Sequence, residues 1–377
     1  MNIGFRGLLL SSCLAVSLWS GNTANAEVSS VRGIPYPAVN TQIGEQYNPD
    51  EAADADRLAT DLSNKVLRDY HRGGARRDAH PKAHGCVKAK FNVLADLPAD
   101  FQAGVFRAGQ SYDSVIRFSN GSPNAVGDDN SGDTRGMAIK ILDVPGEKLF
   151  ADPAHPAAQD FILISSPYFF VNGSAGYTEF FRIVNNGGLL SLFKIPFILG
   201  LGGTINAGKM LSQKIDNPLN VRYYSVTPYQ LGDAAQNQVV KYSTKPCAPI
   251  DAAKADDGPN FLRHAMQDHL RDGSACFIFG VQTRPDDSYS IEDVITEWPE
   301  DGAPFIDVAR IEIPQQEFDT APQNEACESM SYNPWHSVEA HRPLGTVNRM
   351  RRVVYEIISA LRFDMNDVSL AERQVIP

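Results

Sequence analysis

Short runs of β-branched and aromatic residues, separated by Gly, Pro, Asn and Asp, recur through the middle of the chain. Runs of this kind are typical of β-strands joined by turns. The pattern becomes β from residue 86 to about 170, and further strands follow later in the chain. The expected strands are 114–118, 137–142, 161–164, 221–226, 239–243, 276–282 and 308–313.

Helical spacing of apolar residues predicts three helices, two of them near the ends of the chain. The first covers 51–72 and is ended by the pair Gly73-Gly74, and the others cover 259–271 and 346–362. Many strands that pair across long sequence distances, with helices gathered at the ends, predict the α+β class. We expect one antiparallel β-barrel core with flanking helices. A barrel of this sort can enclose a ligand.

The composition is that of an ordinary globular protein, with 43% apolar and 21% charged residues among 377. The formal net charge is −11, so we expect no general binding to the phosphate backbone of nucleic acids. A local cluster of arginines could still bind an anionic small molecule.

The first 26 residues have the features of a secretory signal peptide. Arg6 supplies positive charge, the apolar run 7–19 is too short to span a bilayer, and an Ala-Asn-Ala sequence at 24–26 matches a cleavage site. We therefore expect a periplasmic or secreted protein that begins at Glu27 and has no transmembrane span. A buried N-terminal helix is one alternative, and a lipoprotein anchored at Cys13 is another.

The remaining chain is expected to consist of an arm, 27–50, and a single domain, 51–377. Export would permit disulfide bonds in this part of the chain. Its four cysteines allow three complete pairings, among which the sequence does not choose, and four separate thiols are the alternative. These cysteines are Cys86, Cys247, Cys276 and Cys327.

The least polar stretch after the signal peptide is 183–208. Lys194, Pro196 and several glycines argue against a helix that crosses a membrane. We expect a buried segment of loop and helix here, and contact with a membrane surface is the alternative.

Three motifs carry side chains suited to catalysis or to ligand binding. Arg77 stands three residues before His80, and a histidine beside an apolar pocket can act as acid and base near neutral pH. Arg117 lies within an apolar strand, where a buried guanidinium needs an anion to meet it. The run from Ser165 to Phe170 forms an aromatic turn, as expected for a flat, apolar ligand. Taken singly, a structural histidine, an internal salt bridge and core packing are equally good or better explanations.

The fourth motif lies on the helix expected over 346–362. Arg351 and Tyr355 are four residues apart, so they are neighbours on one helix face. The guanidinium can donate to the phenol oxygen and favour the phenolate, which is a hard anionic ligand for ferric iron. Arg362, two turns beyond Tyr355, could meet a carboxylate at the rim of a bound ring. An amphipathic helix with ordinary surface arginines is the alternative.

The order and spacing of these motifs resemble those of the haem catalase superfamily. The resemblance runs from about Arg77 to Arg362, which is nearly the whole mature chain. The matched family motifs are R-x-x-H-x-K at 77–82, R-F-S at 117–119, D-x-R-G-x-A-x-K at 133–140, N-x-P-x-F-F at 165–170 apart from its first residue, and R-x-x-x-Y at 351–355 with a further Arg at 362.

The resemblance implies a haem b enzyme that decomposes peroxides and uses a reductant of unknown identity. In the family, Tyr355 would be the proximal iron ligand and His80 the distal acid and base. Oligomers are usual among relatives, so a homo-oligomer is expected. The residues that would contact the haem, its propionates or the proximal ligand are Arg77, Arg117, Phe170, Arg351 and Arg362.

Two departures from the family point to the small catalase-related subgroup of peroxidases and hydroperoxide-rearranging enzymes. Ser165 stands where the family has a distal Asn that orients peroxide, so we expect weak dismutation of hydrogen peroxide. The chain also ends soon after Tyr355, whereas typical catalases continue into a further helical domain. The larger catalases hold NADPH there, so NADPH is not expected.

Two other functions stay open at this stage. The enzyme could process organic or fatty-acid hydroperoxides, with the apolar stretch 192–199 lining an access path, or the protein could bind haem without turnover. His84 could pair with His80 as a metal ligand on a helix, but Pro81 and Gly85 argue against a regular helix here. We expect His84 to be structural or to line the entrance.

Overall fold

The computed structural model describes residues 30–186, 188–233, 238–250 and 256–377. The expected signal peptide, its cleavage site and Cys13 lie outside the described residues, as do the first residues of the arm. The rest of the arm includes a two-stranded antiparallel sheet of β1 (Ser30–Val31) and β2 (Ile34–Pro35).

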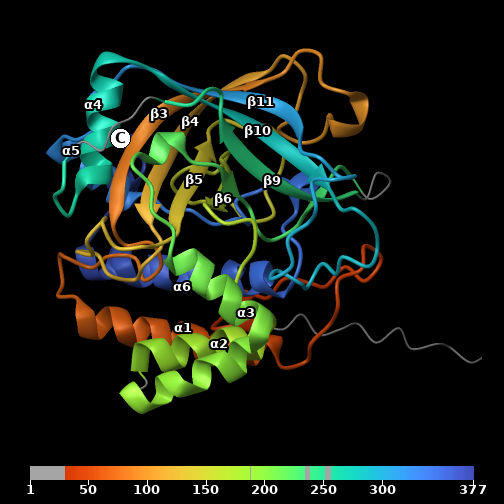
Figure 1. Cartoon of the computed structure of the whole chain (residues 1–377), viewed down its shortest axis with the longest axis vertical. Helices are drawn as coiled ribbons and strands as arrows, with labels where there is room; N and C mark the ends of the chain where they lie inside the picture. Colours follow the sequence, from red (N-terminus) through yellow and green to blue (C-terminus); the bar gives the residue numbers. More distant parts are fainter. Residues whose placement is uncertain (1–29, 187, 234–237, 251–255) are drawn as a thin grey trace, which may run out of the picture.

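In the described part of the chain, eight antiparallel strands close into a barrel (Figure 1). Pairing of β9 with β10 closes the ring, and β8 (Tyr229–Leu231) extends the sheet beside β9. In their order around the barrel, the eight strands are β10 (Ala275–Thr283), β11 (Ile306–Ile313), β3 (Ala83–Val93), β4 (Ser111–Asn120), β5 (Arg135–Ile141), β6 (Gln159–Ile164), β7 (Tyr223–Tyr224) and β9 (Gln238–Pro246).

The helices lie mainly against one side of the barrel. Helix α6 runs along the barrel, and α1 and α2 form a further layer below it (Figure 1). The helices are α1 (Glu51–Asp69), α2 (Ser174–Asn186), α3 (Ile195–Leu211), α4 (Phe261–Asp272), α5 (Ala321–Ser329), α6 (Thr346–Asn366) and α7 (Leu370–Arg373). Short 3-10 helices are η1 (Ala99–Phe101), η2 (Leu189–Lys194), η3 (Pro218–Asn220) and η4 (Glu339–His341).

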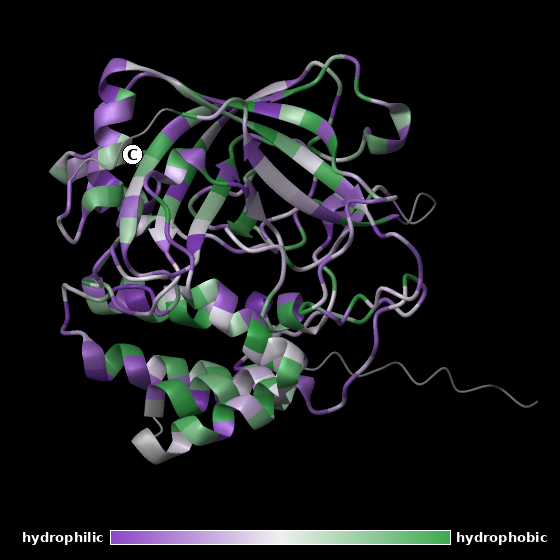
Figure 2. Ribbon diagram, in the orientation of Figure 1, coloured by the Kyte–Doolittle hydropathy of each residue, from purple (hydrophilic) through white to green (hydrophobic). Residues whose placement is uncertain are grey.

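The predicted α+β class, with a barrel core and flanking helices, is confirmed. Each of the seven expected strands and each of the three expected helices overlaps an observed element. The strand expected over 221–226 is shorter, because Val226 adopts a left-handed φ of 62° and the backbone N–H of Thr227 turns back to the carbonyl of Ser225 at 2.6 Å. Hydrophobic and hydrophilic residues are interleaved along the barrel strands (Figure 2), as expected for strands with one face on the core.

Aromatic side chains fill the interior of the barrel. The rings of Phe161 and Phe279 lie 5.0 Å apart between centroids, and Tyr242 packs 4.9 Å from Phe161. The ring of Phe106 stacks on that of Phe161, with 6.2 Å between the two centroids. Because these rings occupy the centre, the expectation that the barrel itself could enclose a ligand is wrong for this part of its interior.

Two disulfide bonds join the four cysteines, Cys86 to Cys327 and Cys247 to Cys276. Their Cα–Cα distances are 5.6 and 5.4 Å, within the usual range for disulfides. The first bond spans 241 residues and ties the end of α5 to β3. The structure therefore selects one of the three pairings that the sequence left open.

The apolar stretch 183–208 is not buried as expected. Much of it forms η2 and α3, and Phe193, Phe197 and Leu201 are 73%, 89% and 81% exposed. Leu199 and Met210 at the ends of this region are buried, whereas Phe193, Phe197 and Leu201 face outward. Among the described helices, none is both long and apolar enough to cross a membrane.

Candidate functional site

A cavity lies on the outer face of the barrel, between strands β4 to β6 and helix α6. Side chains alternate along a strand, so Phe118 and Ile139 point into the barrel core while Arg117, Ser119 and Ala138 point outward to the cavity. The empty space among its lining residues is about 800 Å³, part of it continuous with solvent. The lining residues are Leu62, Arg77, Asp78, Ala79, His80, Arg117, Ser119, Gly136, Met137, Ala138, Ile162, Leu163, Ser331, Tyr332, Val354, Tyr355, Ile358, Ser359 and Arg362.

His80 enters the cavity from the loop before β3 and is held in an unusual backbone conformation. Its φ is 56°, a left-handed value that costs a non-glycine residue about 1 kcal/mol or more. The ring nitrogen Nδ1 lies 3.2 Å from Ser119 Oγ, and the His80 carbonyl accepts a hydrogen bond of 2.9 Å from Arg117. Burial and the nearby Arg117 charge lower the pKa of His80 to about 4. The imidazole is therefore neutral at pH 7 and able to accept a proton.

A glycine on β5 makes room for this imidazole. A Cβ atom on Gly136 would lie 2.6 Å from His80 Nδ1 and 2.7 Å from Ser119 Oγ, closer than real Cβ contacts come. The ring therefore packs directly on the backbone of β5. Any larger residue at this position would move His80 or Ser119.

Tyr355 reaches the same cavity from α6, with Arg351 beside it. The Nε–H of Arg351 donates to the Tyr355 hydroxyl oxygen at 3.1 Å, as expected for residues four apart on a helix. Burial alone would lower the pKa of Arg351, but the phenol oxygens of Tyr355 and Tyr229 raise it above its usual value. The guanidinium is thus a permanent cation at the Tyr355 oxygen. Arg351 itself lies behind Tyr355 and is not among the cavity-lining residues.

Three arginines meet at one end of the cavity around a carboxylate that the sequence did not single out. Arg77 Nη1 lies 3.0 Å and Arg117 Nη2 lies 3.5 Å from Glu328 Oε1. Arg362 donates to the backbone carbonyls of Glu328 and Met330, the latter at 3.2 Å. Burial opposes ionisation of Glu328, but Arg77, Arg117 and Arg362 outweigh it and lower the pKa of Glu328 to about 2. We call Arg77, Arg117, Arg362 and Glu328 the arginine cluster.

The disulfide bond explains how Glu328 comes to this place. Cys327, the preceding residue, is bonded to Cys86 on β3, so the end of α5 is fixed beside the barrel. No motif marks Glu328 in the sequence, and the only hint is its position next to one of four cysteines whose pairing was unknown.

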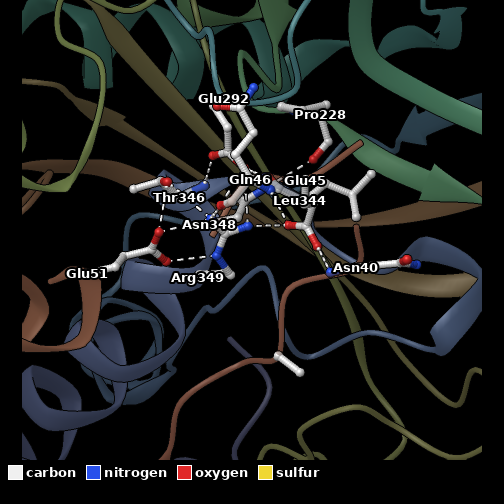
Figure 3. Close-up of polar contacts among 12 residues, drawn as sticks. Asn40, Glu45, Gln46, Glu51, Pro228, Glu292, Leu344, Thr346, Asn348 and Arg349 are labelled. Carbon is white, nitrogen blue, oxygen red and sulfur yellow. Dashed lines mark hydrogen bonds and ion pairs between the residues drawn. The ribbon is translucent and has the colours of Figure 1, made fainter. Parts of the chain in front are cut away.

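Helix α6 is held in register by buried charged side chains at its N-terminal end. Figure 3 shows the guanidinium of Arg349, which is fully buried, among the carboxylates of Glu45, Glu51 and Glu292. Its Nε lies 2.7 Å from Glu51 and its Nη2 3.3 Å from Glu292. Glu45 and Glu292 also accept hydrogen bonds from the backbone N–H groups of the first residues of the helix. This cluster fixes the helix that carries Tyr355.

Ser165 and Phe170 are not among the residues that line the cavity. The Ser165 hydroxyl accepts a hydrogen bond from the Arg135 backbone N–H at 2.8 Å and donates to Gln213 at 2.6 Å. Phe170 packs instead against Phe169 and Phe180.

The remaining candidates are structural in this fold. His84 is buried, and its Nε2 lies 2.9 Å from Asn120 Oδ1. Among the residues that the structure describes, no group of three or more His, Cys, Asp or Glu is placed to hold a metal ion. No described residue of α2, η2 or α3 lines the cavity, so the apolar stretch 192–199 does not form its wall.

The sequence matches no protein-family model and no curated protein. Solved structures are similar in fold. A fungal catalase is 16% identical, with 93% of this chain and 71% of that chain covered and a TM-score of 0.63. Catalase A from Saccharomyces cerevisiae has the same identity, TM-score and share of this chain, with 74% of its own chain covered. For a bacterial catalase the identity is 16%, the covered shares are 91% and 67%, and the TM-score is 0.57. The chain therefore has the fold of the catalases.

Proposed function

We propose that this protein is an exported haem b enzyme of the small catalase-related subgroup that decomposes peroxides. The observation that carries the proposal is one cavity in a catalase fold that is lined by His80, by Tyr355 with Arg351 bonded behind it, and by the three arginines of the arginine cluster. Two disulfide bonds support export, because such bonds persist in oxidising compartments.

The cavity has the chemistry that a porphyrin with two carboxylates requires. Met137, Ile162, Val354 and Ile358 supply apolar surface for a flat ring. Arg117 Nε is buried and has no hydrogen-bond partner among the described residues, so this guanidinium has donor capacity left for a carboxylate. The Tyr355 oxygen supplies an oxygen ligand of the kind that ferric iron accepts.

Each of these side chains has a distinct role in the proposed reaction. Haem, when bound, supplies the redox-active iron. Tyr355 would be its proximal ligand, and the Arg351 cation would stabilise the phenolate oxygen. His80, neutral at pH 7, would take a proton from one peroxide oxygen and return it to the other as the oxygen–oxygen bond breaks. Arg77, Arg117 and Arg362 would pair with the propionates.

Ser165 is proposed to support the position of β5, on which His80 packs, and not to contact peroxide itself. Its hydroxyl braces the start of β5 through the Arg135 backbone, one residue before the glycine on which His80 packs. A homo-oligomer and the absence of bound NADPH are further proposals, which light scattering and nucleotide titration of the haem-loaded protein would test.

The proposal is tested by haem titration of the purified protein and of two Tyr variants. Tyr355→Phe is expected to lose most bound haem or to shift its main absorption band strongly. Tyr332→Phe is the matched control, because Tyr332 lines the same cavity but has no bond to Arg351. Identical spectra for the wild type and Tyr355→Phe would contradict the proposal.

Steady-state peroxide consumption then separates the possible substrates. The wild type is expected to consume peroxide, and rates with hydrogen peroxide, cumene hydroperoxide and a fatty-acid hydroperoxide give the preference. Haem that binds normally but passes readily to apomyoglobin, without any peroxide consumption, would identify a haem carrier instead.

A further inference from the structure

The segment formed by η2 and α3 presents apolar side chains to solvent. Phe193, Phe197 and Leu201 are each more than 70% exposed, and Leu192, Ile205 and Leu211 are at least 40% exposed. We call these six residues the apolar face. Clusters of this kind are uncommon on monomeric soluble proteins and mark places where a partner or a membrane binds.

The structure fixes the apolar face in this outward orientation. On the inner side of α3, Gly203 packs so tightly on the Phe170 carbonyl that a Cβ atom there would collide with it. Asn206 Nδ2 donates to the carbonyls of Phe169 at 2.9 Å and Ile295 at 2.8 Å. Leu199 and Met210 take up the remaining room on the inner side of the helix, and the six residues of the apolar face point to solvent.

The charges around the apolar face differ from those of the rest of the chain. The chain has a formal net charge of −11, yet residues 180–215 contain no Asp or Glu. The same stretch holds four cations, of which Arg182 pairs with Glu179. Lys194, Lys209 and Lys214 are exposed. An apolar face bordered by lysines is complementary to a surface that is both apolar and anionic.

We propose that the apolar face docks on the surface of an anionic phospholipid bilayer. Phe193, Phe197 and Leu201 would enter the boundary between head groups and acyl chains, and the lysines would lie at the level of the phosphates. A second copy of the chain fits less well. A symmetric interface sets the same patch on both copies, so it would bring together two segments that each carry lysines and, over residues 180–215, no Asp or Glu.

The test is sedimentation of the full-length protein with vesicles of phosphatidylglycerol mixed with phosphatidylcholine, and with vesicles of phosphatidylcholine alone. The wild type is expected to sediment with the anionic vesicles and to be released as salt rises. The double variant Phe193→Ser with Phe197→Ser should partition about a hundredfold more weakly, because two exposed rings no longer leave water. Replacing Lys194 and Lys214 by Gln should weaken binding to the anionic vesicles.

The matched control replaces two exposed apolar residues elsewhere, Val126→Ser with Leu370→Ser, and should bind like the wild type. Equal sedimentation of the wild type and of the Phe193 and Phe197 double variant would overturn the proposal. It would also be overturned if the wild type ignored both vesicles and light scattering showed a dimer that the same double variant dissociates. Because binding is measured without peroxide, its outcome is independent of the proposed enzymatic function.

Discussion

Glu328 shows how a single residue can complete a site that motifs reveal only in part. Arg117 was singled out because a guanidinium buried in an apolar strand needs an anion, whereas Arg77 and Arg362 were singled out by their motifs. The sequence left open whether the anion is a ligand or an internal carboxylate, and in this structure Glu328 supplies a carboxylate of the chain itself. A bound porphyrin carboxylate would therefore compete with Glu328 for the same arginines.

Replacing Glu328 by Gln should separate two roles of the arginine cluster, which are to stabilise the fold and to bind a ligand carboxylate. Loss of the charged hydrogen bonds should lower the free energy of unfolding of the haem-free protein by about 2 kcal/mol. The unpaired arginines should at the same time bind haem about tenfold more tightly, which corresponds to about 1.4 kcal/mol. Urea unfolding and haem titration measure the two effects.

Glu325→Gln on the same helix is the control, because Glu325 is exposed and should change neither quantity. Haem binding that is weaker in Glu328→Gln than in the wild type would show that Glu328 does not compete with the ligand. Ser165 and Phe170 lie beyond the end of β6 and are not among the cavity-lining residues, because a motif gives the order of residues along the chain but not which of them face the cavity.

Helices and strands whose apolar residues recur at a regular spacing were predictable, and those in which charged residues interrupt that spacing were not. The helix expected over 346–362 is present as Thr346–Asn366, because its apolar stripe faces the neighbouring α1. Strand β3 was not predicted as a unit, because Lys88 and Lys90 on its exposed side dilute the apolar signal of its buried side. Helix α5 has start signals in Thr320 and Pro322 but no clear apolar stripe, and its position depends on a distant disulfide bond.

Replacing Arg349 by Leu should loosen α6 more than any surface change on the helix. The substitution leaves Glu45, Glu51 and Glu292 buried without their cation, and such losses cost about 3–5 kcal/mol. Thermal or urea unfolding measures the loss of stability. Arg310→Leu, which removes an exposed ion pair on β11, is the control and should cost less than about 1 kcal/mol. Equal effects of the two substitutions would refute this role for Arg349.

For the whole molecule, the fold class was predictable but the closure of the barrel and the site were not. Closure rests on the pairing of β9 with β10, which no local pattern specifies. The site lies on the outer face of the barrel because α6 covers strands whose two sides are both buried there. The nearly continuous apolar runs of these strands predict strands, but they do not indicate which side of the strand contacts a ligand.

Buried neutral histidines should make the whole fold sensitive to acid. The folded-state pKa values of His80, His84 and His341 are lowered by burial to about 4, 3 and 3, from 6.5. Between pH 6.5 and about 4, unfolding therefore takes up three protons. Burial raises the pKa of Asp78 to about 6, so this group releases one proton on unfolding and offsets one of the three.

A net uptake of about two protons lowers the free energy of unfolding by about 3 kcal/mol per pH unit as the pH falls through 5. Urea unfolding of the haem-free protein at a series of pH values between 7 and 5 measures this slope. A free energy of unfolding that stayed constant or rose toward pH 5 would contradict the assignment of these histidines as neutral in the fold.

The cavity draws its walls from both ends of the chain, since His80 and Arg117 precede Tyr355 and Arg362 by more than two hundred residues. A ribosome that has made only the first two thirds of the protein has not yet made the wall of the pocket that runs from Ser331 to Arg362. Whatever molecule the pocket accepts must therefore be inserted at the close of maturation, into a nearly finished fold, and a chain truncated before its last long helix would leave that molecule in solution.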